Sequence, residues 1–389
     1  MIGRHGRRRD NNSPVCEVNY HKMTLEYFPL PGTPIELLDT PALVIDLDVV
    51  ESNIRKLQKW ADKNRVSVRP HAKTHKSPYF AKKQIDAGAI GICAAKVSEA
   101  EVLVNGGVSE VMIPNEIVGE RKIARLMSLA RHARMIVAVD SADNVRELSA
   151  AAIEFGAELG VIIEVDVGQA RCGVEAGPAV VRLAKVIAKS PGLRFDGLMG
   201  YEGHLVATRD YEVRKTETQK AMEKLVGSAD AVRKAGIPVK IVSAAGTGTY
   251  NITGAIKGIT ELQCGSYIFM DGDYLQVFKD FEPALNVLAN VISRPVPDRA
   301  ITDAGLKSIS TDRGVPQVVG LTGATVVGLS EEHGKLKVEG AATRLKVGDR
   351  VRFLPMHGDT TINLHTHYFG IRKGKLEAVI PIEGRGKIR

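Results

Sequence analysis

Cysteines, aromatic residues and long apolar runs are all scarce in this sequence, and each scarcity argues against a particular class of protein. Four cysteines stand among 389 residues without any C-x-x-C pair, which is typical of small buried thiols in a reducing compartment. Aromatic residues make up only 5%, and no nucleic-acid-binding motif is present. No apolar run is long enough to span a membrane. We therefore predict a cytoplasmic protein with neither a membrane nor a nucleic-acid partner.

The N-terminus also lacks the apolar h-region of a secretory signal. Residues 1–26 are predicted to be a disordered tail or an over-extended start with Met23 as the initiator, and a transit peptide is the remaining alternative. Among the thiols, Cys93, Cys172 and Cys264 lie in core-like stretches and are expected to be buried.

The composition is that of a globular protein with an excess of positive charge. Hydrophobic residues make up 44% and charged residues 25%, and the formal net charge is +8. A chain of this length is expected to form two domains. An anionic small substrate or a phosphate-bearing cofactor would account for the positive balance.

Strand-like and helix-like segments alternate over residues 27–280. The segment 48–64 has apolar residues at helical spacing, and β-branched runs recur between the later helices. Counted from VSV (66–68), eight such runs occur, which is the number that a (β/α)8 barrel requires. The earlier run ALVIDL (42–47) is surplus and is expected to belong elsewhere. A doubly wound open sheet is the alternative fold.

The pattern changes after residue 280. Residues 281–389 contain strand-like runs joined by Gly, Asp and Asn turns, with almost no helical periodicity. We predict a second domain here, an antiparallel β domain.

Polar residues follow one strand after another in the predicted barrel. In such a barrel the carboxyl ends of the strands meet at one mouth, where the chemistry gathers. The side chains expected to meet there are in HAK (71–73), Asn115 with Glu116, GQARCG (168–173), Tyr201 with His204, GTGTY (246–250) and residues 265–267.

Two of these stretches together indicate pyridoxal phosphate. In RPHAKTHKS, Lys73 follows a strand, where desolvation and nearby positive charge favour the neutral amine that a Schiff base needs. Lys76 is the rival, but we expect it to enter the next helix and face solvent. GTGTY offers glycine N–H groups and threonine hydroxyls to an anion such as a phosphate. A solvated basic loop and an ordinary turn are the alternative interpretations.

Several segments, in order, resemble the D-threonine aldolase and D-serine dehydratase-like family of fold-type III pyridoxal-phosphate enzymes, which is related to alanine racemase. The resemblance covers residue 34 to the C-terminus. The segments are TPALVIDLD, RPHAKTHKS, EVDVGQARCG, GYEGH, SAAGTGTY, ELQCGSYIFMD and PMHGDTTINLH.

The resemblance implies a role for each matching residue. Lys73 would join the cofactor covalently, Arg171 would contact its 3-oxygen, and Gln263 would face the pyridine nitrogen. The residues that would contact the ring or the phosphate are Tyr201, Gly246, Thr247, Gly265 and Tyr267.

The late motif MHGD decides which reaction the resemblance implies. His357 and Asp359 stand at i and i+2, so on a strand they would share one face and could anchor a divalent metal. In the aldolases of this family the corresponding motif is H-x-D, and in the D-serine dehydratases it is typically H-x-C. Asp359 therefore favours an aldolase that binds Mn²⁺ or Mg²⁺, with Zn²⁺ as the alternative. Without the resemblance, a structural turn would be the better interpretation. His365 and His367 are expected to be loop residues.

These features predict a lyase that cleaves D-β-hydroxy-α-amino acids to glycine and an aldehyde, with His204 or a metal-bound hydroxide as the base. D-serine dehydratase and a non-catalytic pyridoxal-phosphate carrier are the alternatives. A hydroxyaspartate aldolase would need a further cationic group, which the sequence does not place. The resemblance also implies a homodimer.

Overall fold

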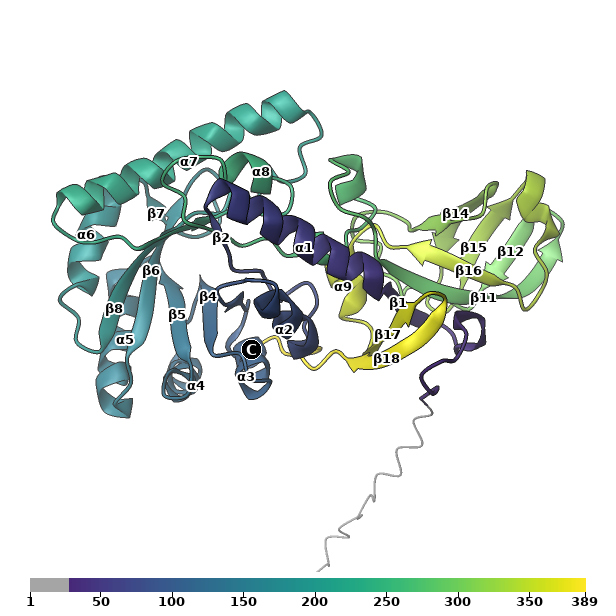
Figure 1. Cartoon of the computed structure of the whole chain (residues 1–389), viewed down its shortest axis with the longest axis horizontal. Helices are drawn as coiled ribbons and strands as arrows, with labels where there is room; N and C mark the ends of the chain where they lie inside the picture. The colour runs from purple at the N-terminus through teal and green to yellow at the C-terminus, as the bar shows by residue number, and fades with distance from the viewer. Residues whose placement is uncertain (1–27) are drawn as a thin grey trace, which may run out of the picture.

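The computed structural model describes residues 28–389, so the predicted tail (1–26) and Cys16 lie outside the described residues. Figure 1 shows two bodies side by side, a helix-covered barrel and a twisted β domain, with a long helix along both. Among residues 28–389 no helix is long and apolar enough to cross a membrane.

The barrel contains the eight parallel strands that the sequence predicted. The alternative prediction of a doubly wound open sheet is wrong. Its order is β2-β10-β9-β8-β6-β5-β4-β3, and a parallel bridge from His71 to Cys93 links the two ends into a ring. The strands are β2 (Ser67–Val68), β3 (Ile92–Cys93), β4 (Glu110–Glu116), β5 (Arg134–Val139), β6 (Leu159–Asp166), β8 (Leu193–Met199), β9 (Ile241–Ala244) and β10 (Glu261–Leu262).

Helices cover the outside of the barrel, and apolar side chains fill its interior. The short strand β7 (Val174–Glu175) pairs with β6 near the mouth. The interior cluster takes one or two residues from each of several strands: Cys93, Met112, Ile136, Ala138, Ile162, Met199 and Ile241. The covering helices are α2 (Pro78–Asp86), α3 (Val97–Asn105), α4 (Glu120–Ala130), α5 (Ala142–Phe155), α6 (Pro178–Ile187), α7 (Tyr211–Lys234) and α8 (Tyr250–Thr253).

The second sheet is antiparallel except at one place. The surplus strand β1 pairs antiparallel with β11 and parallel with β17, so it belongs to this sheet and makes it mixed. Its strands are β1 (Ala42–Asp46), β11 (Leu285–Val296), β12 (Arg299–Thr302), β13 (Gln317–Val319), β14 (Ala324–Leu329), β15 (Gly334–Val338), β16 (Arg350–Leu354), β17 (His367–Arg372) and β18 (Lys375–Pro381).

Helix α1 (Leu47–Asn64) and the C-terminal residues hold the two bodies together. The Asp46 carboxylate accepts hydrogen bonds from two N–H groups of the first turn of α1, and Arg65 ends the helix in the left-handed conformation. The buried face of α1 packs on both β2 and β17. The last residues return to the barrel, where Ser98 N–H donates to the Arg389 carbonyl. The barrel mouth is therefore fixed against the second sheet.

Candidate active site

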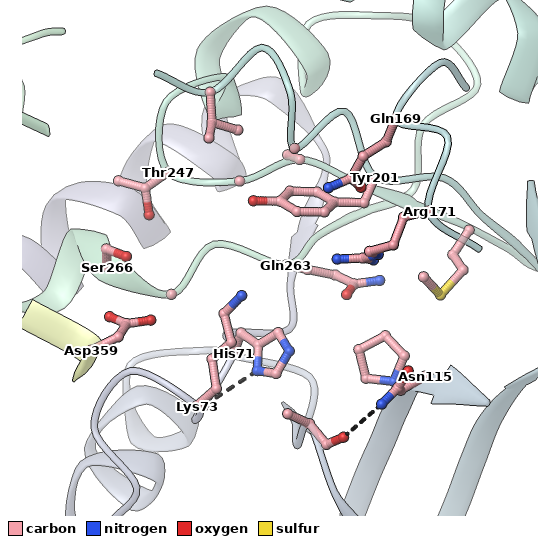
Figure 2. Close-up of a pocket in the computed structure, with 18 of the residues that line it drawn as sticks. His71, Lys73, Asn115, Gln169, Arg171, Tyr201, Thr247, Gln263, Ser266 and Asp359 are labelled. Carbon is pink, nitrogen blue, oxygen red and sulfur yellow. Dashed lines mark hydrogen bonds between the residues drawn. The ribbon is translucent and has the colours of Figure 1, made fainter. Parts of the chain in front are cut away.

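A cavity of about 420 Å³ opens at the barrel mouth against the second sheet. Most of the side chains and glycines that the sequence singled out line this one cavity, so the structure brings them together (Figure 2). These residues are Lys73, Arg171, Tyr201, Gly246, Thr247, Gln263, Gly265, His357 and Asp359.

Lys73 lies in the turn that follows β2, and its amine points into the cavity (Figure 2). The Lys73 backbone N–H donates to Nδ1 of His71 at 3.3 Å, which fixes the turn, and Nζ lies 5.9 Å from the Tyr201 ring centroid. Burial, followed by the positive charge of Lys73, holds the pKa of His71 well below its usual range. His71 is therefore a neutral imidazole beside the amine.

Lys76 corrects one prediction. It precedes α2 with a φ of 51° instead of entering that helix, and its side chain is 11% exposed. Its ammonium pairs with Glu99 at 2.5 Å, because the turned backbone directs it at α3 and away from solvent. Lys76 is a structural ion pair outside the cavity lining, which leaves Lys73 as the lysine of the cavity.

Two loops at the mouth form a candidate anion cradle, one after β9 and one after β10. The Thr247 hydroxyl oxygen accepts the Tyr267 N–H at 3.0 Å and so ties the loops together. Beneath them, the fully buried Glu202 accepts hydrogen bonds from the hydroxyls of Thr249, at 2.7 Å, and Thr253. Within residues 28–389, the N–H groups of these loops that have no acceptor include those of Thr247, Gly248, Gly265 and Ser266. Unpaired N–H groups in a cradle of this kind suit a phosphate.

Arg171 and Tyr201 lie on one side of Lys73, and Asp359 lies on the other (Figure 2). The Arg171 guanidinium is 5.7 Å from the Tyr201 ring centroid, and its Nη2 is 3.4 Å from Oε1 of Glu164. Burial first, and then the charge of Glu116, raises the pKa of Glu164 to about 8. The amide of Gln263, directly after β10, donates to the Ser243 hydroxyl at 2.8 Å.

His357 and Asp359 both line the cavity, although the predicted strand is wrong. His357 is the N-cap of the short helix α9 (Gly358–Ile362), and Asp359 is in its first turn. The Asp359 Oδ2 accepts a hydrogen bond from the Thr74 hydroxyl at 3.2 Å, while its buried Oδ1 has no partner among residues 28–389. The Nδ1 of His357 is 2.5 Å from Oδ2 of Asp312. This bond orients the imidazole, as carboxylates do for metal-binding histidines.

Two acidic residues that the sequence analysis missed support this pair. Asp271 accepts the Gly358 N–H at 3.0 Å, and burial raises its pKa to about 6. Although burial opposes it, hydrogen bonding from His357, Ser310 and Thr360 lowers the pKa of Asp312 to about 2. Asp271 ends one of the recognised segments, which is a usable signal, whereas nothing in the sequence marks Asp312.

The side chains of three further residues lie in positions other than those predicted. His204 is exposed beside Gly168 and is not among the cavity-lining residues, because buried Glu202 anchors the preceding chain and the next turn directs His204 outward. The Tyr267 side chain is in the core, where its hydroxyl accepts from Gln84 at 3.0 Å, and only its backbone N–H serves the cradle. Cys172 is only half-buried and lines the cavity.

The remaining corrections and omissions are smaller. His365 lies in a loop, as expected, but His367 begins β17. His71, Gln169 and Ser266 line the cavity too, and they lie in stretches that the sequence placed at the mouth, whereas Tyr274 and Arg313 were not singled out from the sequence.

Comparison with known proteins identifies the class of this fold. Residues 45–273 match the family described as alanine racemase, N-terminal domain, and residues 284–371 match the putative serine dehydratase domain. The D-threonine aldolase of Arthrobacter sp. is 42% identical over 92% of this chain and 95% of that protein. The 3-hydroxy-D-aspartate aldolase of Paracoccus denitrificans is 40% identical over the same shares. Dehydratases of the family match at 32% identity or less.

A solved structure agrees with these matches. The D-threonine aldolase from Filomicrobium marinum superposes with a TM-score of 0.91 at 39% identity, over 93% of this chain and all of that one. The protein is thus of the class in which an alanine racemase-like barrel is joined to a serine dehydratase-type domain. The chain belongs to the D-threonine aldolase and D-serine dehydratase-like family of fold-type III pyridoxal-phosphate enzymes, and it is a pyridoxal-phosphate-dependent lyase.

Proposed function

We propose that this lyase cleaves D-β-hydroxy-α-amino acids to glycine and an aldehyde, using pyridoxal phosphate and a divalent metal. The observation that carries the proposal is the hydrogen bond from Thr74 to Asp359 at 3.2 Å. It joins the residue after Lys73 to the late H-x-D motif, so the amine and the candidate metal ligands share one cavity.

The cavity fits pyridoxal phosphate. The cradle offers its unpaired N–H groups to the phosphate, and Lys73 offers its amine to the aldehyde. Glycine at 265 lets this loop approach the turn that carries Lys73, because a Cβ there would lie 2.7 Å from the Thr74 hydroxyl. Arg171 and Gln263 would hold the two edges of the ring. When bound, the cofactor supplies a ring that withdraws electrons from the substrate's Cα.

The H-x-D motif fits a divalent metal with room for other ligands. The buried, unpartnered Oδ1 of Asp359 and the imidazole oriented by Asp312 are suitable donors. No cluster of three or more candidate ligands occurs within residues 28–389, so water and substrate would complete the coordination. One imidazole and one carboxylate favour Mn²⁺ or Mg²⁺ over Zn²⁺. The metal would lower the pKa of the substrate's β-hydroxyl.

The residues of the chain position the reacting bond. Tyr201 and His71 flank the Lys73 amine, and the second sheet closes the cavity on the side of Asp359. The β-hydroxyl is held near His357 and Asp359, so the Cα–Cβ bond lies between them and the cofactor site. Breaking that bond leaves an aldehyde and, after Cα takes up a proton, glycine. The exposed position of His204 gives no support to its predicted role as the base.

The test is to give the purified protein D-threonine and D-serine, each with and without a chelator. The proposal predicts glycine and acetaldehyde from D-threonine, lost with the chelator. Pyruvate from D-serine as the main product would instead favour the dehydratase, and no product would favour a carrier protein. We also propose the homodimer that the family resemblance implies, which sedimentation analysis would check.

A further inference from the structure

Arg313 is a charged residue of the cavity that the proposed reaction does not use. It lies in the loop 303–316 between β12 and β13, and its side chain reaches the cavity beside His357 and Asp359. The cavity therefore contains two arginines. Arg171 stands on the barrel side beside Tyr201, and Arg313 comes from a loop of the second domain.

The contacts of Arg313 leave part of its guanidinium available. Nη1 pairs with Oδ2 of Asp273 at 2.5 Å, and the side chain is 42% exposed. In the part of the chain that the structure describes, Nε and Nη2 have no acceptor. A guanidinium held on one side by Asp273 can still offer two N–H groups to a carboxylate in a forked arrangement.

The loop around Arg313 is fixed at the candidate metal site. Asp312, the preceding residue, is bonded to Nδ1 of His357 at 2.5 Å and to the Thr360 hydroxyl at 2.9 Å. Arg313 is thereby held next to the place where the β-hydroxyl would bind. Figure 2 shows Asp359 and Arg171 on opposite sides of Lys73, so Arg171 is on the cofactor side of the substrate. A second substituent on the hydroxyl-bearing carbon would lie on the side of Arg313.

We propose that Arg313 binds a carboxylate carried on the substrate's Cβ, so that the preferred substrates are D-β-hydroxy-α-amino acids with an acidic side chain. This inference rests on the proposed function. With 3-hydroxy-D-aspartate the Cα–Cβ bond breaks, its electron pair stays on Cα, and Cα gains a proton to give glycine. The β-hydroxyl loses its proton and becomes the carbonyl of glyoxylate. The atoms balance without an oxidant or reductant.

The first test compares kcat/KM for 3-hydroxy-D-aspartate and D-threonine in the wild type and in Arg313→Gln. Loss of a charged, forked hydrogen bond should lower kcat/KM for the acidic substrate about 100-fold, mainly through KM, and leave D-threonine within about 3-fold. Arg344→Gln, an exposed arginine of the same domain, is the matched control and should change neither value. Retained D-threonine cleavage shows that Arg313→Gln is folded.

Asp273→Asn provides an independent measurement. Removing the competing carboxylate should lower KM for 3-hydroxy-D-aspartate, and Arg313→Lys should restore only part of the lost affinity because an ammonium lacks the fork. Equal losses for both substrates in Arg313→Gln would assign the arginine to the α-carboxylate and overturn the inference, as would no loss for either. A wild type that cleaves neither compound would instead refute the proposed function, and this inference with it.

Discussion

The barrel side of the cavity and the side formed by residues 271–359 carry different chemistry. The barrel supplies an amine, a guanidinium and unpaired N–H groups, which suit an anionic cofactor. The other side, here called the second wall, supplies an imidazole and a carboxylate backed by Asp271 and Asp312, which suit a cation. Separate elements of the fold therefore position the cofactor site and the metal site. A substitution in one wall should therefore leave the ligand of the other in place.

Lys73→Ala should have the largest effect and test the barrel wall. Without the amine no Schiff base forms, so the yellow absorbance should vanish and activity should fall by about 10⁴-fold or more. The bound metal, measured by elemental analysis, should be unchanged because the second wall is intact. Lys82→Ala, an exposed lysine on α2, is the control and should retain colour and activity. Persistence of the colour in Lys73→Ala would reassign the reactive lysine.

Asp359→Asn should have the opposite effect to Lys73→Ala, with loss of the metal and retention of the cofactor. A neutral amide is a poor ligand, so metal content should fall and activity should drop by about 10³-fold, the scale of Lewis-acid stabilisation. The Schiff-base absorbance should remain. A chelator should cause the same loss in the wild type, and added Mn²⁺ should reverse it there but not in the variant. Loss of colour together with metal would show that the two walls are not independent.

The barrel wall was predictable because one rule places it. Parallel strands bring their carboxyl ends to one mouth, so residues as far apart as Lys73 and Gly265 could be expected to meet. No such rule exists for the loops of a β domain. Arg313 reaches the cavity because the hydrogen bond from Thr360 to Asp312 holds the loop 303–316 against α9, and one sequence does not reveal such a contact between distant segments.

Errors within the barrel wall have local causes. Lys76 has a positive φ, which is uncommon for a lysine and was not foreseeable from its neighbours. His204 is the last residue of the recognised segment GYEGH, but the buried Glu202 two residues earlier decides which way the turn faces. Tyr267 stands two residues after the cavity-lining Gly265, yet the centroid of its ring lies 5.6 Å from that of Phe281 in the core. For these residues, their position in the sequence correctly predicted the loop in which they lie. It did not predict the direction in which their side chains point.

Asp312→Asn should weaken metal binding in the second wall, with a smaller effect than Asp359→Asn. The carboxylate accepts from Nδ1 of His357 and so directs Nε2 at the cavity. An amide can accept the same bond but cannot stabilise positive charge, so metal affinity should fall about 10- to 100-fold with colour unchanged. The measurement is a titration of metal-free protein with Mn²⁺. An unchanged affinity would mean that His357 is oriented without its carboxylate partner.

Glu164→Gln should have the smallest effect, and only on stability at high pH. Burial, followed by the charge of Glu116, raises the pKa of Glu164 to about 8 in the folded protein, above its unfolded value near 4.3. Its favourable contribution is therefore complete below the unfolded pKa and is lost as pH rises through the folded pKa. Glutamine cannot ionise, so the stability of the variant relative to the wild type should be about 4 kcal/mol greater at about pH 9 than at about pH 5.

Urea unfolding at several pH values measures this difference, and Glu154→Gln, an exposed residue of α5, is the control that should follow the wild type. Parallel curves for Glu164→Gln and the wild type would show that Arg171, 3.4 Å away, keeps the carboxylate ionised in the folded protein. The barrel wall would then hold a fixed ion pair beside the cofactor. A gap between the curves that widens from about pH 5 to about pH 9 would show instead that Arg171 faces a neutral carboxyl and keeps its positive charge for the cofactor.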